Sequence, residues 1–225
     1  MKKEDQKILL NNFGEKVQFN YDLKKKNWFN IGGKSKIFFK ADGLKELISF
    51  LKIINNKEKI FILGAGSNTL ISDNLFDGIV IKLGKSFNNI SLLNEDIIIA
   101  GTSVLDKSLS EFAKINNLSG LEFLSCIPGT VGGGIKMNAG CFGKEFKDIL
   151  LSIQVIDKFG NVSTIQSKDI NFEYRNSNLP ENLIFLSASF KAKKSEASII
   201  QSKIDELKLK KENSQPTKIK TSGST

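Results

Sequence analysis

The chain of 225 residues contains no histidine, the commonest general base near neutral pH. Its absence excludes the Ser-His and Cys-His schemes of nucleophilic catalysis. The two cysteines, Cys126 and Cys141, are too few for a disulfide framework and lack the spacing and histidine partners of a zinc site. We therefore interpret both as packed thiols, expect no metal site, and expect the protein to lie in a reducing cytoplasm.

The N-terminal region lacks a long hydrophobic run. Residues 1–6 are charged, and they lead into only one short apolar pair, Leu9 and Leu10. We expect neither a secretory signal nor a membrane span, and no membrane partner. A hydrophobic content of 40% is still enough to bury a substantial core.

The formal net charge of +9 suits an anionic partner, which could be a nucleic acid, a membrane surface or a ligand that carries phosphates. Much of the excess is lysine, accompanied by abundant asparagine and isoleucine, and genome composition alone can produce this combination. The chain also lacks the interleaved aromatic and basic residues of RNA-binding modules. We expect no nucleic-acid partner.

Hydrophobic periodicity predicts mixed helices and strands. The predicted strands are 36–40, 59–63, 78–83, 90–93, 96–100, 150–157, 162–166 and 183–191, and the predicted helices are 44–54, 104–115 and 195–211. The first part of the pattern is an α/β unit and the second is α+β. We place subdomain boundaries at 1–85, 86–192 and 193–225.

A loop of small residues, Gly64-Ala65-Gly66-Ser67-Asn68, follows a predicted strand. Small residues let backbone N–H groups approach an anion such as a pyrophosphate. The loop lacks the third glycine of the Rossmann fingerprint and the lysine of a Walker loop. Taken alone, it is interpreted more simply as a tight turn.

A second loop, Ile127-Pro128-Gly129-Thr130-Val131-Gly132-Gly133-Gly134, is much richer in glycine. Such density is costly in chain entropy, which suggests that the backbone lies against something flat or highly charged. Asn138-Ala139-Gly140 adds a third segment of small residues. A dinucleotide cofactor is the functional interpretation, and a connection packed only on itself remains the alternative.

These strings resemble one family. Residues 63–68 (LGAGSN) are similar to the pyrophosphate loop of the UDP-N-acetylenolpyruvoylglucosamine reductases. Residues 120–134 (GLEFLSCIPGTVGGG) and 137–143 (MNAGCFG) are similar to the second flavin loop of that family. Asn27 with Ile31-Gly32-Gly33 resembles its N-terminal motif, although Trp28 stands where a threonine is usual.

The resemblance covers nearly the whole chain and implies an α+β architecture. The expected fold is the two-subdomain FAD-binding fold of the vanillyl-alcohol oxidase type, followed by the start of an incomplete third, substrate-binding subdomain. The implied cofactors are FAD and NADPH, and the implied partner is a UDP-sugar. The cofactor-binding residues that it implies are Gly64, Ala65, Gly66, Ser67, Asn68, Ile127, Pro128, Gly129, Thr130, Gly132, Gly133, Asn138, Ala139 and Gly140.

The reaction implied is the reduction of UDP-N-acetylglucosamine enolpyruvate to UDP-N-acetylmuramate in peptidoglycan synthesis, by a chain that is a monomer when complete. An enolate-like charge develops in such a reaction, and a guanidinium with several donors in one plane suits it. Arg175, within residues 172–177 (FEYRNS), matches the catalytic arginine of the family, with Tyr174 beside it at the substrate. Ser224 aligns with the serine that donates a proton.

The family continues beyond this serine into a catalytic glutamate and most of the third subdomain, and neither has a counterpart in this sequence. We therefore expect a chain truncated at its C-terminus. The alternative function is a fragment that binds flavin and is inactive because it lacks the glutamate. Covalent attachment of FAD through histidine, common elsewhere in the wider fold, is excluded because there is none.

Overall fold

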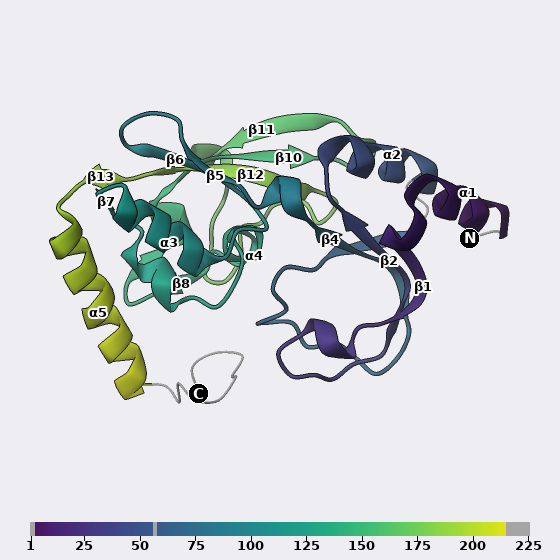
Figure 1. Ribbon diagram of the computed structural model, residues 1–225, viewed down its shortest axis with the longest axis horizontal. Helices are drawn as coiled ribbons and strands as arrows, with labels where there is room; N and C mark the ends of the chain where they lie inside the picture. The colour runs from purple at the N-terminus through teal and green to yellow at the C-terminus, as the bar shows by residue number, and fades with distance from the viewer. Residues whose placement is uncertain (1–2, 56–57, 215–225) are drawn as a thin grey trace.

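The computed structural model describes residues 3–55 and 58–214. Two β-sheets lie side by side, each with its own helices, and α5 runs along the outer edge (Figure 1). The helices are α1 (Lys3–Phe13), α2 (Leu44–Ile54), α3 (Asp106–Ile115), α4 (Val131–Lys136) and α5 (Ala197–Ser214). The strands are β1 (Val17–Asp22), β2 (Lys34–Ala41), β3 (Lys59–Ile62), β4 (Phe76–Leu83), β5 (Ile90–Leu92), β6 (Ile97–Gly101), β7 (Leu118–Ser119), β8 (Gly140–Cys141), β9 (Lys144–Glu145), β10 (Leu150–Ile156), β11 (Val162–Gln166), β12 (Ile184–Lys191) and β13 (Lys193–Lys194).

The first sheet has the order β1-β2-β4-β3, in which β2, β4 and β3 are parallel and β1 is antiparallel to β2. Helix α2 connects β2 to β3, as a crossover between parallel strands requires. It buries four apolar side chains at helical spacing, and the Phe50 ring stacks on Phe39 of β2 at a centroid distance of 3.9 Å. Asn55 ends the helix in the left-handed conformation at φ 45°.

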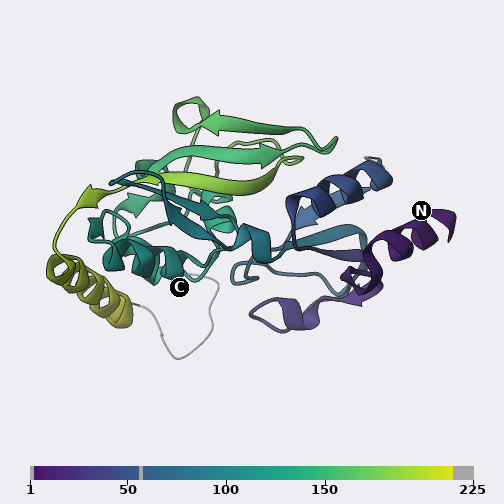
Figure 2. The same ribbon diagram turned by 45° about the horizontal axis from the view of Figure 1, so that its top comes forward.

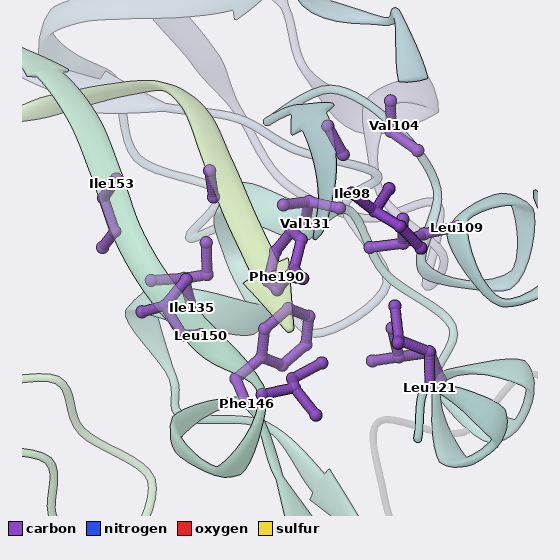
Figure 3. Close-up of a cluster of buried hydrophobic side chains, with 14 of the residues drawn as sticks. Ile98, Val104, Leu109, Leu121, Val131, Ile135, Phe146, Leu150, Ile153 and Phe190 are labelled. Carbon is purple, nitrogen blue, oxygen red and sulfur yellow. The ribbon is translucent and has the colours of Figure 1, made fainter. Parts of the chain in front are cut away.

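The second sheet has the order β11-β10-β12-β6-β5, with every neighbouring pair antiparallel. Its inner face packs on α3 and α4. Figure 3 shows Phe190 of β12 and Ile98 of β6 close to Leu109 of α3 and Val131 of α4. Phe146 also packs in this core, with its ring centroid 6.0 Å from that of Phe190.

The two sheets share apolar packing. Ile156, Ile184 and Leu186 belong to the second sheet, yet they join the buried cluster formed by the first sheet, α1 and α2. Ser103 adds a polar link, because its hydroxyl donates to the carbonyl of Leu83 at 2.9 Å. Figure 2 shows the ends of β10 and β12 reaching toward α2. The arrangement of the two units is therefore fixed by a buried contact.

Most of the sequence-predicted elements are confirmed within a few residues, and the helix at 44–54 has both predicted ends. Several elements were not predicted, among them the two-residue strands β7, β8, β9 and β13 and three longer elements. The charged start of the chain forms α1, whose Phe13 is held against Phe39 and Phe50. Strand β1 lies at the edge of the first sheet, and a glycine-rich stretch expected to be loop forms α4. Among the described residues, no helix is long and apolar enough to cross a membrane.

Candidate functional site

The first glycine loop, residues 64–68, leaves the end of β3 without a break. Leu63 still donates its N–H to the carbonyl of Ile81 in β4 at 2.9 Å. Over the described part of the chain, the N–H groups of residues 64–68 have no protein acceptor, whereas the carbonyls of Gly64 and Gly66 each accept a bond. Free N–H groups at the carboxyl end of parallel strands are suited to bind an anion.

The N-terminal motif around Asn27 holds this loop in place. Trp28 donates its N–H to the carbonyl of Gly66 at 3.0 Å. Gly66 has φ 71°, and a Cβ on it would lie 2.2 Å from the carbonyl oxygen of Lys26, so only glycine allows this approach. The Asn27 side chain, 5% exposed, donates to the carbonyl of Ile31 at 2.7 Å and fixes the turn that follows.

Lysines gather beside the first loop. Lys82 of β4 donates from Nζ to the carbonyl oxygen of Gly64 at 2.9 Å. Lys40 lies directly beside it in the ladder between β2 and β4. Burial, and then the charges of Lys26 and Lys40, hold the pKa of Lys82 below its ordinary value. Like charges side by side are unfavourable, and a bound anion would relieve this repulsion.

The second glycine loop touches the first one. A Cβ on Gly64 would lie 2.6 Å from Oγ1 of Thr130, so the two loops meet at these two residues. Among the described residues, the N–H groups of Thr130 and Gly133 find no protein acceptor. Gly133 is exposed, and a Cβ on it would have Oγ1 of Thr130 as its nearest neighbour, at 3.5 Å. This contact therefore gathers the free N–H groups of both loops in one region.

The other glycines of α4 serve packing. A Cβ on Gly132 would lie 3.0 Å from Cβ of Thr102, and one on Gly134 would lie 2.2 Å from the ring of Phe146. Both contacts are with the protein itself. Two of the three glycines of α4 therefore allow close packing against Thr102 and Phe146, and Gly133 is the exception.

Asn138 is a structural junction. Its side chain is 1% exposed, and Nδ2 donates to Oε2 of Glu145 at 3.0 Å and to the carbonyl of Glu173 at 3.2 Å. Its Oδ1 accepts the N–H of Lys147 at 3.1 Å. Because both donors and one acceptor position are engaged, this side chain joins three segments and holds them together.

The two residues after Asn138 also pack within the protein. Ala139 donates its N–H to the carbonyl of Gly134 at 2.7 Å. A Cβ on Gly140 would lie 2.6 Å from the carbonyl oxygen of Lys144, which explains the glycine where β8 pairs with β9.

Arg175 lies at the tip of a tight turn, where Glu173 and Asn176 exchange N–H···O bonds of 2.9 and 3.2 Å. Its φ of 59° is unusual for a residue with a side chain and costs about 1 kcal/mol. The guanidinium carbon lies 5.3 Å from the ring centroid of Tyr174, which is 84% exposed. The bond from Asn138 to Glu173 ties this strained turn to the third segment of small residues, 138–140.

Asp106, the first residue of α3, is a buried acid against the second loop. Its side chain is 0% exposed, and neither carboxyl oxygen has a hydrogen-bond partner among the described residues. A Cβ on Gly129 would lie 2.7 Å from Oδ2, and Asp106 donates its own N–H to the carbonyl of Gly129 at 3.1 Å. Burial raises the pKa of Asp106 to about 8, so the carboxyl keeps its proton at neutral pH.

Because Asp106 is buried with its proton, we expect the stability of the protein to depend on pH in an unusual way. The unfolded chain ionises Asp106 near pH ~4, whereas the folded chain holds the proton until about pH 8, so stability falls as pH rises between these values. Asp106→Asn should therefore become more stable relative to wild type with rising pH, by at most about 1.4 kcal/mol per pH unit. Urea unfolding at several pH values between about pH 5 and pH 8 measures the difference in the free energy of unfolding between the variant and the wild type.

The exposed Asp169 in the 3-10 helix Ser167–Asp169 provides the control, and Asp169→Asn should follow the wild-type profile. Parallel profiles for wild type and Asp106→Asn would show that Asp106 is ionised in the folded chain.

Residues 35–166 match the sequence family described as FAD binding domain. UDP-N-acetylenolpyruvoylglucosamine reductase from Pelagibacter ubique is 62% identical over 215 residues, which cover 96% of this chain and 71% of the relative. The reductase of that name from Rickettsia canadensis is 44% identical over 206 residues, covering 92% of this chain and 69% of the relative. This chain belongs to the UDP-N-acetylenolpyruvoylglucosamine reductase family. It is therefore a flavoprotein oxidoreductase with an FAD-binding domain.

Solved structures support the same fold. UDP-N-acetylenolpyruvylglucosamine reductase from Thermus caldophilus is similar with a TM-score of 0.79 and 28% identity, over 92% of this chain and 72% of that one. P-cresol methylhydroxylase shares the fold alone, with a TM-score of 0.59 at 14% identity, over 87% of this chain and 44% of that one. The expected α+β, FAD-binding fold of the vanillyl-alcohol oxidase type is thus confirmed.

The structure joins the first loop to the second through Gly64 and Thr130, and the third segment, residues 138–140, to the turn of Arg175 through Asn138. Ser224 lies outside the described residues. No cluster of three or more metal-ligating acids or cysteines occurs within residues 3–55 and 58–214. Sequence reasoning missed Lys82, although a lysine within the apolar run 78–83 (GIVIKL) was a signal for it.

Proposed function

We propose that this member of the reductase family reduces UDP-N-acetylglucosamine enolpyruvate to UDP-N-acetylmuramate, with FAD as cofactor and NADPH as electron donor. The names of its relatives and the FAD-binding domain support this reaction. We place it in the cytoplasm, where NADPH and UDP-sugars are made, and propose that it acts as a monomer.

The observation that carries the proposal is the contact between the two glycine loops. Free N–H groups of residues 64–68 and Thr130, with Lys82 beside them, provide the donors and the positive charge that the pyrophosphate of FAD needs. In this proposal the flavin lies between subdomains 1–85 and 86–192, and residues 193–225 belong to a third, substrate-binding one. In this proposal the side chain of Asn138 positions the loop through its three hydrogen bonds.

Lys82→Met tests the charge at the first loop. Methionine keeps an apolar stem in the partly buried strand and removes the ammonium, so the Kd for FAD should rise about tenfold, the equivalent of one lost charge-assisted bond. Quenching of flavin fluorescence measures this Kd. Lys59→Met, at the exposed start of β3, is the matched control and should bind FAD like the wild type. Equal Kd values for the two variants would exclude Lys82 from the site.

Bound FAD supplies the transfer of hydride from NADPH to the alkene of the substrate. The task of the chain is then to hold the substrate and manage its charge. Arg175 is exposed, its charge is permanent, and its backbone is held by the turn between Glu173 and Asn176. We assign to it the carboxylate of the enolpyruvyl group and the enolate-like charge that develops there, with Tyr174 flanking the sugar and Ser224 as the proton donor.

The proposal is tested by watching the flavin absorbance without oxygen. NADPH should bleach the flavin of the purified chain, and the enolpyruvyl UDP-sugar should then restore its colour while UDP-N-acetylmuramate forms. Bleaching without recovery would contradict the proposed reaction and would favour the alternative, a chain that binds flavin and is inactive. A substrate analogue in which the alkene is already reduced is the control, and it should not restore the colour.

A further inference from the structure

The turn that carries Arg175 is attached on both of its arms to the end of α4. On the arm before Arg175, the carbonyl of Glu173 accepts a hydrogen bond of 3.2 Å from Nδ2 of Asn138. On the arm after Arg175, the N–H of Ser177 donates to the backbone carbonyl of Lys136 at 3.2 Å. Lys136 is the last residue of α4, and Asn138 follows shortly after it. One short segment therefore holds both arms of the turn.

Lys136 also holds the second arm through its side chain. Its ammonium donates from Nζ to the carbonyl oxygen of Leu179 at 2.8 Å. The Leu179 side chain is buried in the core of the second sheet, so the carbonyl beside it has a fixed place. Hydrogen bonds from a charged donor are among the stronger ones in a protein. Lys136 thus holds the chain at Ser177 and again at Leu179.

The turn depends on such support because its backbone is strained. Arg175 and Asn178 both have left-handed backbones, at φ 59° and 49°. Conformations of this kind persist where the surrounding structure fixes them. Asn178 lies between the two points that Lys136 holds. Without the ammonium, this arm can relax and carry the guanidinium of Arg175 with it.

Helix α4 gives these attachments a rigid support. Val131 and Ile135 are both 0% exposed, and they anchor the helix in the core of the second sheet (Figure 3). The helix begins directly after Thr130, where the two glycine loops touch, and its other end holds the turn of Arg175. The helix therefore sets the distance between the contact of the loops and the guanidinium.

A lysine at the end of a helix has a simpler role, because a cation there interacts favourably with the helix dipole. The bond that the ammonium of Lys136 makes goes to Leu179, however, which lies outside α4 on the arm of the turn. The place of this bond therefore favours a role in holding the turn.

We propose that Lys136 is a positioning residue for the reduction of the substrate and that it acts through Arg175. The inference rests on the proposed function and adds a residue to it. The ammonium fixes the arm after Arg175 at the carbonyl of Leu179, so that the guanidinium keeps its place relative to the second glycine loop, where the flavin is proposed to bind. In this role the side chain of Lys136 bonds to the protein and not to the substrate.

Hydrogen exchange of the apoprotein tests the attachment without any turnover. Lys136→Met keeps an apolar stem and removes the ammonium, so the amides within residues 173–179 should exchange at least about tenfold faster than in the wild type. Lys136→Arg can still donate to the carbonyl of Leu179 and should exchange nearly like the wild type. Lys168→Met, at an exposed position in Ser167–Asp169, is the matched control and should leave the exchange unchanged. Equal exchange in the wild type and Lys136→Met would overturn the proposal.

The effect on the reaction is measured by the reoxidation of NADPH-reduced flavin by the enolpyruvyl UDP-sugar, without oxygen. Lys136→Met should be about tenfold slower than the wild type, because a small displacement of a positioned group is costly. Its reduction by NADPH and its Kd for FAD should equal those of the wild type, since both glycine loops keep their bonds. Lys136→Arg should recover most of the rate. A rate that falls only because flavin is lost would contradict the proposal, since the lysine would then serve the fold.

The double variant Lys136→Met/Arg175→Ala shows whether the lysine acts through the arginine. It should reoxidise its flavin as slowly as Arg175→Ala alone, with no further loss. Losses that multiply in the double variant, or a wild-type rate in Lys136→Met beside a slow Arg175→Ala, would overturn the inference and leave the proposed function standing. A wild-type rate in Arg175→Ala would instead contradict the proposed role of Arg175, and the inference about Lys136 would fall with it.

Discussion

Arg175→Ala should slow the reoxidation of reduced flavin by the enolpyruvyl UDP-sugar by about 10²- to 10³-fold, the usual cost of removing one group that stabilises a developing charge. Arg175 is the only arginine among the 33 basic residues, so no neighbouring guanidinium can replace it. Rapid mixing of the NADPH-reduced protein with substrate, without oxygen, measures this rate. The flavin content should match that of the wild type, because the turn lies outside both glycine loops.

Further variants separate charge, geometry and strain. Arg175→Lys keeps the charge without the planar donors and should fall between wild type and Arg175→Ala. Arg175→Gly should reoxidise its flavin as slowly as Arg175→Ala does. It should be no less stable than the wild type, because glycine accepts φ 59° without strain. Lys168→Ala, at an exposed position in Ser167–Asp169, is the control for lost surface charge. A wild-type rate of reoxidation in Arg175→Ala would remove this residue from the mechanism.

Gly66→Ala should weaken the binding of FAD by at least about a hundredfold, which corresponds to about 2.7 kcal/mol. The new methyl would lie 2.2 Å from the carbonyl oxygen of Lys26, at a φ of 71° that disfavours any side chain. The backbone must then move, and the bond from Trp28 to the carbonyl of Gly66 is lost with the loop geometry. Titration of the apoprotein with FAD measures the affinity, and urea unfolding measures the accompanying loss of stability.

Gly14→Ala is the matched control for this change, since Gly14 lies far from both loops in the sequence, at the start of the 3-10 helix Gly14–Lys16. Gly14 has a similar φ of 54°, but a Cβ on it would meet nothing within 4 Å. Alanine at this position therefore carries the cost of the left-handed backbone, about 1 kcal/mol, without the collision. If both variants bind FAD equally well, the first loop does not hold the cofactor.

Much of the fold could be predicted because local pattern and tertiary packing agree. The helix at 44–54 has apolar residues at helical spacing and an asparagine at its end, and both of its limits were predicted. The same agreement holds for the hairpin of β10 and β11, which has a turn of Lys158, Phe159, Gly160 and Asn161 between its strands. In these elements each residue prefers locally what the core also requires.

The remaining elements depend on contacts that no local pattern contains. Helix α4 contains three consecutive glycines, Gly132 to Gly134, and forms because two of them pack against Thr102 and Phe146. Helix α1 has a polar sequence and depends on Phe13 reaching the aromatic residues of β2 and α2. In both cases tertiary packing overrides the low local propensity.

In the candidate site, too, some features follow from local sequence and others depend on tertiary contacts. Its loops could be predicted from the glycine-rich strings and the family resemblance, because backbone approach demands small residues at fixed places. Asp106 could not, since its burial depends on how α3 packs against the second loop at Gly129. A buried acid without a partner is likewise visible only once its surroundings are known.

The central claim is that the two glycine loops together form the FAD site. Titration of the apoprotein with FAD, followed by flavin fluorescence for the wild type and for Thr130→Val, tests it most directly. Valine keeps the size of threonine but removes the hydroxyl at the point where the loops touch. The account predicts one FAD per wild-type chain and weaker binding by the variant. Failure of the wild-type chain to bind FAD, while it remains folded, would contradict the account.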